Sequence, residues 1–254
     1  MIDLSLWFVF ILVFIRMTSF FVSSPIFSLR NIPNGVKIGT GLMISLILFP
    51  QLPTGNITIP DHLMYFIGFA VSETLTGLIF GLAANCIFSA VRIAGQYLDI
   101  QIGFAMAMIV DPANGMQNTL VAQFFYLLGV LMFFSLDLHH VLISALVTSF
   151  DLVPPGDLLI NDHVILSVIK IFVLMFSFAL RMALPVILVL VISDISLGLI
   201  SKTVPQFNVM MIGFPLKIGV GIMTLFLLTP VLGTLIGSLL QTMGDQILLL
   251  IRGN

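Results

Sequence analysis

Long apolar stretches separated by short polar connectors form the dominant pattern of this chain. A helix needs about 20 apolar residues to cross the hydrocarbon core of a bilayer. The predicted helical stretches are residues 4–27, 38–49, 62–91, 120–150, 164–192 and 209–251. All but the second reach that length, so the pattern predicts an all-α integral membrane protein of long, proline-broken helices and helical hairpins. The short second stretch counts against a simple serpentine of transmembrane helices.

Polar residues and prolines subdivide some of these stretches. The sequence DLHH at residues 137–140 interrupts the stretch 120–150, which predicts two helical pieces there. Pro185 has no backbone N–H to donate and therefore predicts a kink. Pro230 predicts that the last stretch turns back on itself, as a C-terminal helical hairpin over about residues 209–251.

Residues 95–118, GQYLDIQIGFAMAMIVDPANGMQN, form neither a clean apolar helix nor a plain polar loop. As a helix, residues 104–110 would rise only about 10 Å, a third of the hydrocarbon thickness. Pro112 and the Asn-Gly pair after it predict a turn. Non-spanning backbone at membrane depth needs protein or a water-filled cavity around it. The segment is therefore either a re-entrant loop that lines or blocks a path, or an interfacial connector.

Composition narrows the possible classes of protein. Hydrophobic residues make up 59% of the chain and charged residues 8%, with a net charge of -2. This balance leaves no basic patch for nucleic acid. The single cysteine, Cys86, excludes an intrachain disulfide and any multi-cysteine metal site.

The sequence contains no strong catalytic or metal-ligating pattern. His139 and His140 would point about 100° apart on a helix, which favours a polar helix boundary over a metal site. Asp99 and Asp111 are the plausible carboxylate pair for an intramembrane hydrolase, but neither a Gly-x-Gly-Asp nor a G-x-S-x-G motif accompanies them. We therefore expect no enzymatic activity, no cofactor and no metal.

Charged residues inside apolar stretches are expected to face protein or water and to have partners. Arg16 lies in the first stretch, and Glu73, the only glutamate, lies in the third. Gly77 and Gly81 follow Glu73 at four-residue intervals, which places the three on one helix face open to close approach by another helix. This spacing favours a packing face over a proton relay. Arg181, one turn before the kink, is a candidate partner for the freed carbonyl or for Glu73.

Basic residues occur in alternate connectors, at Arg30 and Lys37, at Arg92, and at Lys202 and Lys217. Because loops rich in lysine and arginine stay in the cytoplasm, this alternation predicts an external N-terminus. The N-terminal residues show neither a basic region nor an A-x-A site, so we expect the first helix to be uncleaved.

Glycine, proline and charged residues also form motifs in a fixed order. The tract at residues 179–220 contains Arg181, Pro185, Asp194, Gly198, Pro205, Gln206, Asn208, Val209, Gly213, Phe214, Pro215 and Lys217. The earlier tracts contain Arg16, Pro25, Pro33, Lys37, Glu73, Gly77, Gly81, Gly95, Gln96, Asp99, Gly103, Asp111 and Pro112. Together, over nearly the whole chain, they resemble the FliR family of flagellar type III secretion export-gate subunits. Lys202 stands where arginine is expected in many relatives, a departure that preserves the charge.

The resemblance implies a non-enzymatic subunit with one helical domain over residues 1–254. It implies one copy of the chain beside FliP and FliQ in a conical gate, near FlhB and FlhA, through which unfolded flagellar proteins leave the cytoplasm. The implied location is the bacterial inner membrane, in contact with membrane lipid at the flagellar basal body. Part of the gate would rise toward the periplasm, so hydropathy spans need not be real spans. The alternative functions are a homologous virulence system and a stand-alone secondary transporter with a midplane site at Glu73 and Arg181.

In such a family the segment between Gly103 and Gly115 would plug the closed channel. The residues that we expect in the plug are Gly103, Phe104, Met106, Met108, Ile109, Val110, Asp111, Pro112, Gly115 and Met116. Its methionines are unbranched and polarizable, and they suit a constriction that re-packs around different polypeptides. Its other apolar residues would keep the closed constriction dry, and its glycines would let the loop swing. Ordinary lipid-facing methionines are the alternative.

Overall fold

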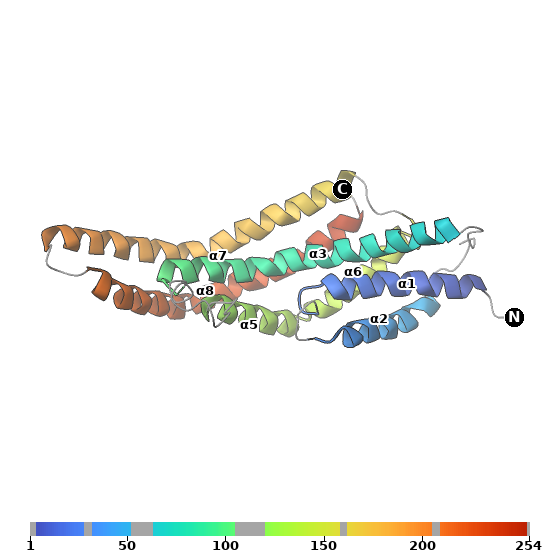
Figure 1. Ribbon diagram of the computed structural model, residues 1–254, viewed down its shortest axis with the longest axis horizontal. Coiled ribbons are helices and arrows are strands. Elements are labelled where there is room, and N and C mark those ends of the chain that lie inside the picture. The colour runs from blue at the N-terminus through green and yellow to red at the C-terminus, as the bar shows by residue number, and fades with distance from the viewer. Residues whose placement is uncertain are drawn as a thin grey trace. The chain divides into compact units, whose positions relative to one another are not determined.

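The computed structural model of the chain is built from helices (Figure 1). It describes residues 4–27, 32–51, 63–104, 120–157, 162–204 and 209–252. The helices are α1 (Leu4–Ser23), α2 (Asn34–Leu48), the 3-10 helix η1 (Phe49–Gln51), α3 (Leu63–Ile102), α5 (Leu120–Ser135), α6 (Leu138–Leu152), α7 (Asp162–Thr203) and α8 (Val209–Arg252). The described ranges contain no strand, and the expected all-α fold is confirmed.

Several of these helices are long and apolar enough to cross a membrane. Among the described residues they are α1, α3, α7 and α8, with the bent pair α5 and α6 as a fifth if the pair forms one span. The helix α2, with 15 residues, is shorter than a span. The chain is therefore a membrane-embedded helical protein, as the apolar pattern predicted.

The chain folds into two compact units, and each is assembled from segments that lie far apart in the sequence. Unit 1 comprises Met1–Phe88, Asp137–Val173 and Gln241–Asn254. Unit 2 comprises Ser89–Leu136 and Leu174–Leu240. The long helices α3, α7 and α8 each contribute one part to each unit.

In unit 1, α1 packs against both α2 and α3. Leu12, Val13 and Met17 on this helix are completely buried. On the side of α2, Gly41 comes so close that a Cβ there would lie 2.8 Å from Thr18 Oγ1. On the side of α3, a Cβ at Gly81 would collide with the side chain of Ser23. These close approaches explain why a mostly apolar helix needs small residues on both of its neighbours.

In unit 2, glycines again mark the closest helix contacts. A Cβ on Gly95 of α3 would collide with the backbone of Ala122 in α5. A Cβ on Gly221 of α8 would lie 2.8 Å from Cγ1 of Ile102 in α3. The first turn of α5 and the first half of α8 therefore both pack tightly against the last turns of α3.

The last turns of α3 lie where the sequence pattern placed the start of a loop. The helix continues through Gly95 to Ile102, so the first eight residues of the expected loop segment 95–118 are helical. Gly95 is tolerated inside the helix because the close contact with α5 requires a residue without a side chain. The loop therefore leaves the helix at Gly103.

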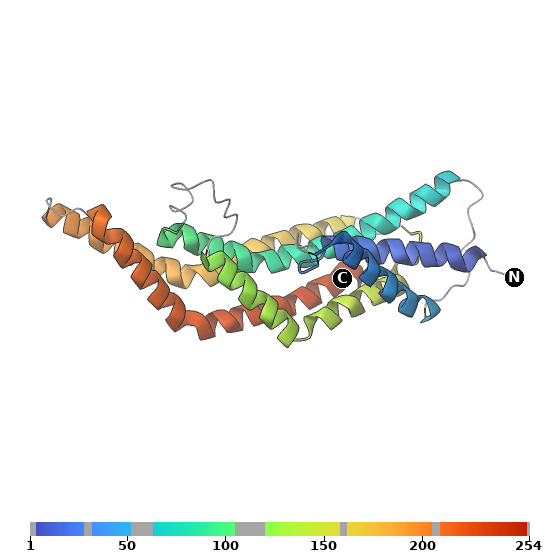
Figure 2. The same ribbon diagram turned by 60° about the horizontal axis from the view of Figure 1, so that its bottom comes forward.

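Two further helices are also longer than expected. The helix α7 continues past residue 192 to Thr203. Within it, the hydroxyls of Ser193 and Ser196 donate to carbonyls one turn earlier, so these polar side chains have partners inside the helix. The expected C-terminal hairpin is wrong, since α8 remains one helix through Pro230. A single proline removes one backbone hydrogen bond and bends the helix without reversing it (Figure 2).

Candidate functional site

A fully buried ion pair joins α1 and α3 in unit 1. Arg16 Nε donates to Glu73 Oε2 at 2.6 Å, and a terminal guanidinium nitrogen donates to Oε1 at 3.0 Å. Both side chains are 0% exposed. Two parallel N–H to oxygen bonds fix the mutual orientation of the two groups, and each charge neutralises the other.

The same pair also organises the end of α6 and the turn that follows it. Arg16 donates to Ser149 Oγ at 3.2 Å and to the Val153 carbonyl at 3.1 Å. Glu73 Oε1 accepts the Gly156 N–H at 2.7 Å. The Phe150 ring centroid lies 4.1 Å from the guanidinium carbon of Arg16. The cluster therefore connects three helices, and neither charge faces lipid.

Gly77 and Gly81 continue the face of α3 that carries Glu73. A Cβ on Gly77 would collide with the Arg16 carbonyl oxygen, and one on Gly81 would lie 2.9 Å from the Phe20 carbonyl oxygen. The face expected from the four-residue spacing thus lies directly against α1. This arrangement matches a packing face, because every group on it touches protein.

The sequence predicts Arg181 as a buried polar residue and a candidate partner of the carbonyl freed by Pro185 or of Glu73. In the structure Arg181 is exposed, and its guanidinium carbon lies 5.6 Å from the Phe178 ring centroid on the same helix. Glu73, in unit 1, is already occupied by Arg16. The sequence could not choose between the two arginines, because both lie in apolar helices at positions far from Glu73 in the chain.

The expected plug loop is described only where it leaves α3. Gly103 has φ +106°, a left-handed conformation that favours glycine, and its N–H donates to the Asp99 carbonyl at 3.1 Å. A Cβ there would lie 3.4 Å from the Phe214 ring. Phe104 is half-buried. The other plug residues lie outside the described residues: Met106, Met108, Ile109, Val110, Asp111, Pro112, Gly115 and Met116.

The described chain resumes at α5, where a carboxylate from α3 meets the first turn. Asp99 is 1% exposed. Its two oxygens accept the N–H groups of Val121 at 3.0 Å and Ala122 at 2.8 Å. We call Gly95, Asp99, Gly103, Val121 and Ala122 the loop neck. The sequence offered Asp99 as a motif residue and as one carboxylate of a hydrolase pair, but it could not show this contact, because the partners of Asp99 lie beyond the loop.

In unit 2, the motif residue Asp194 of α7 pairs with the motif residue Lys217 of α8. Its Oδ2 accepts Lys217 Nζ at 2.8 Å and Gln101 Nε2 at 3.4 Å. Gly213 is buried and Pro185 is half-buried, whereas Pro215 is exposed. Pro205, Gln206 and Asn208 lie outside the described residues. The Asp194 contacts therefore tie the end of α3 to both α7 and α8.

The break between α5 and α6 carries the one three-residue group of potential metal ligands in the described part of the chain. Ligand atoms of Asp137, His139 and His140 lie within 4.8 Å of one another. Asp137 has φ +54° and is the N-cap residue of α6. The two imidazole rings are 4.2 Å apart. The polar helix boundary expected here is confirmed, because α5 ends at Ser135 and α6 begins at Leu138.

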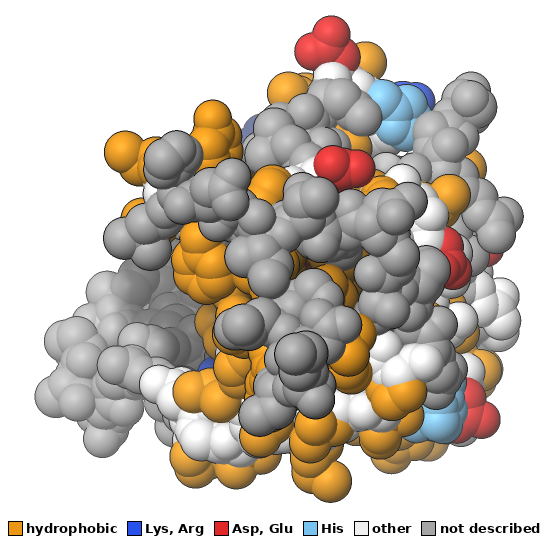
Figure 3. All heavy atoms as spheres, turned by 90° about the vertical axis from the view of Figure 1, so that its right-hand side faces the viewer, with side chains coloured by type: hydrophobic (Ala, Val, Ile, Leu, Met, Phe, Trp, Pro, Cys, Tyr) orange, Lys and Arg blue, Asp and Glu red, His pale blue; other side chains and the backbone are white. Residues whose placement is uncertain are grey.

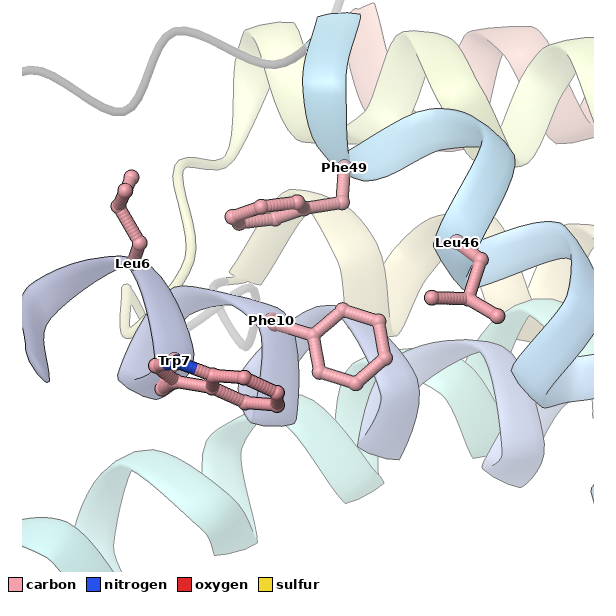
Figure 4. Close-up of a pocket in the computed structure, with 5 residues that line it drawn as sticks. All are labelled: Leu6, Trp7, Phe10, Leu46 and Phe49. Atoms are coloured by element: carbon pink, nitrogen blue, oxygen red, sulfur yellow. The ribbon is translucent and has the colours of Figure 1, made fainter. Parts of the chain in front are cut away.

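An apolar pocket of about 270 Å³ lies between α1 and α2 in unit 1 (Figure 4). Leu6, Trp7 and Phe10 line it from α1, while Leu46 and Phe49 line it from α2 and η1. All five of these described lining residues are apolar. Such a surface suits the apolar interior of a membrane or of a protein interface.

Much of the apolar surface is uncovered in the single chain. In the apolar stretch of membrane-span length, only 17% of the residues of α7 and 11% of those of α8 are buried. Phe226 and Leu227 of α8 are among the exposed residues. On the face shown in Figure 3, hydrophobic side chains reach the surface, and acidic and histidine side chains lie in its upper and right-hand parts. These faces must therefore contact lipid or other protein.

Comparison with known proteins places this arrangement in one family. Residues 7–243 match the family described as "Bacterial export proteins, family 1". The chain is 36% identical to flagellar biosynthetic protein FliR of Bacillus subtilis (strain 168), over 85% of this chain and 84% of that protein. It is 33% identical to FliR of Escherichia coli (strain K12), over 86% and 83%. The chain therefore belongs to the FliR family of bacterial export proteins, which has a role in flagellar export.

Proposed function

We propose that this chain is a subunit of the flagellar type III protein export gate. It forms, with FliP and FliQ, the channel through which unfolded flagellar proteins leave the cytoplasm, and the loop at residues 103–115 plugs the closed channel. The gate lies in the bacterial inner membrane at the flagellar basal body, near FlhB and FlhA. The chain acts by packing and sealing, with no catalytic step.

The observation that best supports assembly into a gate is the length of α7 and α8. Their 42 and 44 residues correspond to rises of about 63 Å and 66 Å. The hydrocarbon core of a bilayer is about 30 Å thick. Lipid can therefore cover only about half of each helix, while large apolar side chains are exposed from Ile165 to Ile200 on α7 and from Ile212 to Val231 on α8. Partner subunits would cover the remainder, as expected of a gate raised out of the bilayer.

The loop neck supports the assignment of the plug. Both ends of the loop are fixed on the last turns of α3, by Gly103 at one end and by Val121 and Ala122 at the other. The described chain therefore leaves α3 and enters α5 at one place. With apolar and methionine residues in its middle, it can fill a constriction and exclude ions.

The gate assembly is tested by purifying a tagged chain from a flagellated host in mild detergent. We expect several copies of FliP and FliQ to copurify with each copy of this chain. A chain that takes up a small solute when reconstituted alone in vesicles would contradict the gate and support the secondary transporter.

The plug is tested with Met106→Asp and Met108→Asp in cells that carry the assembled gate. Carboxylates in the constriction would hydrate it, so we expect faster leakage of small ions across the inner membrane. Leu131→Asp on α5 is the control, because Leu131 is 69% exposed and lies outside the loop. Wild-type leak rates in an assembled Met106→Asp gate would contradict the plug.

A further inference from the structure

Three potential metal ligands lie together at the start of α6 in unit 1. One oxygen of Asp137 and one imidazole nitrogen from each of His139 and His140 lie within 4.8 Å of one another. The two ring centroids are 4.2 Å apart, with 40° between the ring planes. Neighbouring residues on a helix point about 100° apart, which counted against a metal site in the sequence. Rotation about the side-chain bonds nevertheless brings the two rings to one place.

We propose that Asp137, His139 and His140 form a binding site for a divalent transition-metal ion, with Zn²⁺ as the ion that fits best. Two imidazoles and one carboxylate are an established ligand set for Zn²⁺, and they leave its fourth tetrahedral position to water. Imidazole is a ligand for zinc, copper and nickel, whereas Ca²⁺ and Mg²⁺ take about six to eight ligands that are nearly all oxygens. The site would be present whether or not the chain forms an export gate, because all three ligands belong to unit 1.

The backbone positions the ligands before any metal binds. Asp137 has φ +54°, a left-handed conformation that aspartate tolerates better than most residues. Its carbonyl accepts the His140 N–H at 3.0 Å, which fixes the first ligand relative to the last. An aspartate at the N-cap position usually accepts a helix N–H with its side chain. The carboxylate of Asp137 makes no such capping bond within the described helix α6, so its oxygens can serve a metal ion.

Apolar contacts hold the same turn in place. Leu138 and Leu142, which flank the two histidines, are 4% and 5% exposed. Val141 Cγ1 lies only 2.9 Å from the position of a Cβ on Gly244, so this turn packs closely on the part of α8 that belongs to unit 1. A ligand-bearing turn that is already ordered loses little further conformational freedom when it binds an ion.

Small side-chain movements would complete the coordination. Bonds of about 2.0–2.1 Å in a tetrahedral site place neighbouring ligand atoms about 3.4 Å apart. Asp137 and His140 are exposed and His139 is half-buried, so the three side chains can approach one ion without opening the core. The negative charge of Asp137 also offsets the positive end of the helix dipole, which by itself disfavours a cation at the start of α6.

The test is calorimetric titration of Zn²⁺ into the full chain in detergent, carrying a tag without histidine and stripped of metal by a chelator. We expect a single Zn²⁺ to bind each wild-type chain. Asp137→Asn keeps the side-chain size and tolerates the left-handed backbone, and His140→Ala removes an exposed imidazole. Loss of a hydrogen-bond partner of a ligand already costs about 10–100-fold in affinity. Each of these variants, which lose a ligand itself, should therefore bind Zn²⁺ at least about tenfold more weakly.

His163→Ala is the matched control, because His163 is a half-buried histidine beside an aspartate in the first turn of α7. Its Zn²⁺ affinity should stay within about twofold of wild type. With chelator present, Asp137→Asn and His140→Ala should melt within about 2 °C of wild type, since both side chains are exposed. Zn²⁺ should raise the melting temperature of wild type and of His163→Ala, and that of the other two variants less.

Three results would overturn the proposal. The first is a wild-type chain that binds no Zn²⁺. The second is a variant, either Asp137→Asn or His140→Ala, that binds Zn²⁺ as tightly as wild type. The third is an equal loss of affinity in His163→Ala, because the binding would then come from scattered histidines and not from the start of α6.

Discussion

Replacing Glu73 by glutamine is the most informative perturbation of the core of unit 1. The substitution keeps the size of the side chain and removes its charge. Arg16 would then remain completely buried with its charge intact and only neutral partners, Ser149 and Val153 among them. The bond from Gly156 to Oε1 can persist to an amide oxygen. The change therefore isolates the loss of charge pairing.

The expected magnitude follows from the geometry of the pair. Two bonds of 2.6 Å and 3.0 Å join fully buried charges. Removing one partner of such a pair costs about 3–5 kcal/mol, because the remaining charge stays buried without compensation. At about 2–4 °C per kcal/mol for a chain of this size, the melting temperature should fall by about 6–20 °C.

The assay is thermal unfolding of the purified chain in detergent, followed by circular dichroism and by tryptophan fluorescence. Trp7, the only tryptophan, lies on α1 and reports on the helix that carries Arg16. The double variant Arg16→Met with Glu73→Gln removes both charges and should melt closer to wild type than Glu73→Gln alone. A melting temperature for Glu73→Gln within about 1 °C of wild type would refute the reasoning.

Three further changes can be followed in the same melting assay. Gly77→Ala should lower stability by about 1–3 kcal/mol, since its Cβ meets the backbone of α1, whereas Gly68→Ala, with open space around it, should be neutral or stabilising. Asp194→Asn should cost less than about 1 kcal/mol, because its pair with Lys217 is partly exposed, and a larger loss would show that the pair is buried in solution. Asp137→Gly should leave the stability unchanged or raise it, because Asp137 has φ +54°, a conformation that favours glycine. A loss of stability above about 1 kcal/mol would contradict this expectation.

The helix boundaries show which structural features the local sequence pattern can predict. The break at Asp137 could be predicted because polar residues interrupt an apolar run. The ends of α3 and α7 could not be predicted, because polar residues in the sequence indicated that these helices end at about residues 91 and 192. Tertiary contacts override that signal: α5 packs on Gly95, and Lys217 pairs with Asp194. A polar or glycine residue ends a helix only when the helical conformation leaves it without a suitable neighbour.

The buried charges show a similar division. The cost of a charge among apolar residues predicts that Arg16 and Glu73 need partners. It does not identify the partners, because α2 and two connectors separate α1 from α3 along the chain. The role of Asp99 is even less accessible, because a carboxylate within an apolar helix is read as a functional group until the N–H groups of α5 are placed beside it.

The central claim, that the loop after Gly103 seals an export channel, is tested most directly by conductance. The assembly purified through this chain is reconstituted in a planar bilayer, with and without residues 104–110. We predict a closed wild-type gate and a steady ionic conductance after the deletion, with the partner subunits still present in both preparations. An intact assembly that stays closed without residues 104–110 would contradict the claim, since other subunits would then form the seal.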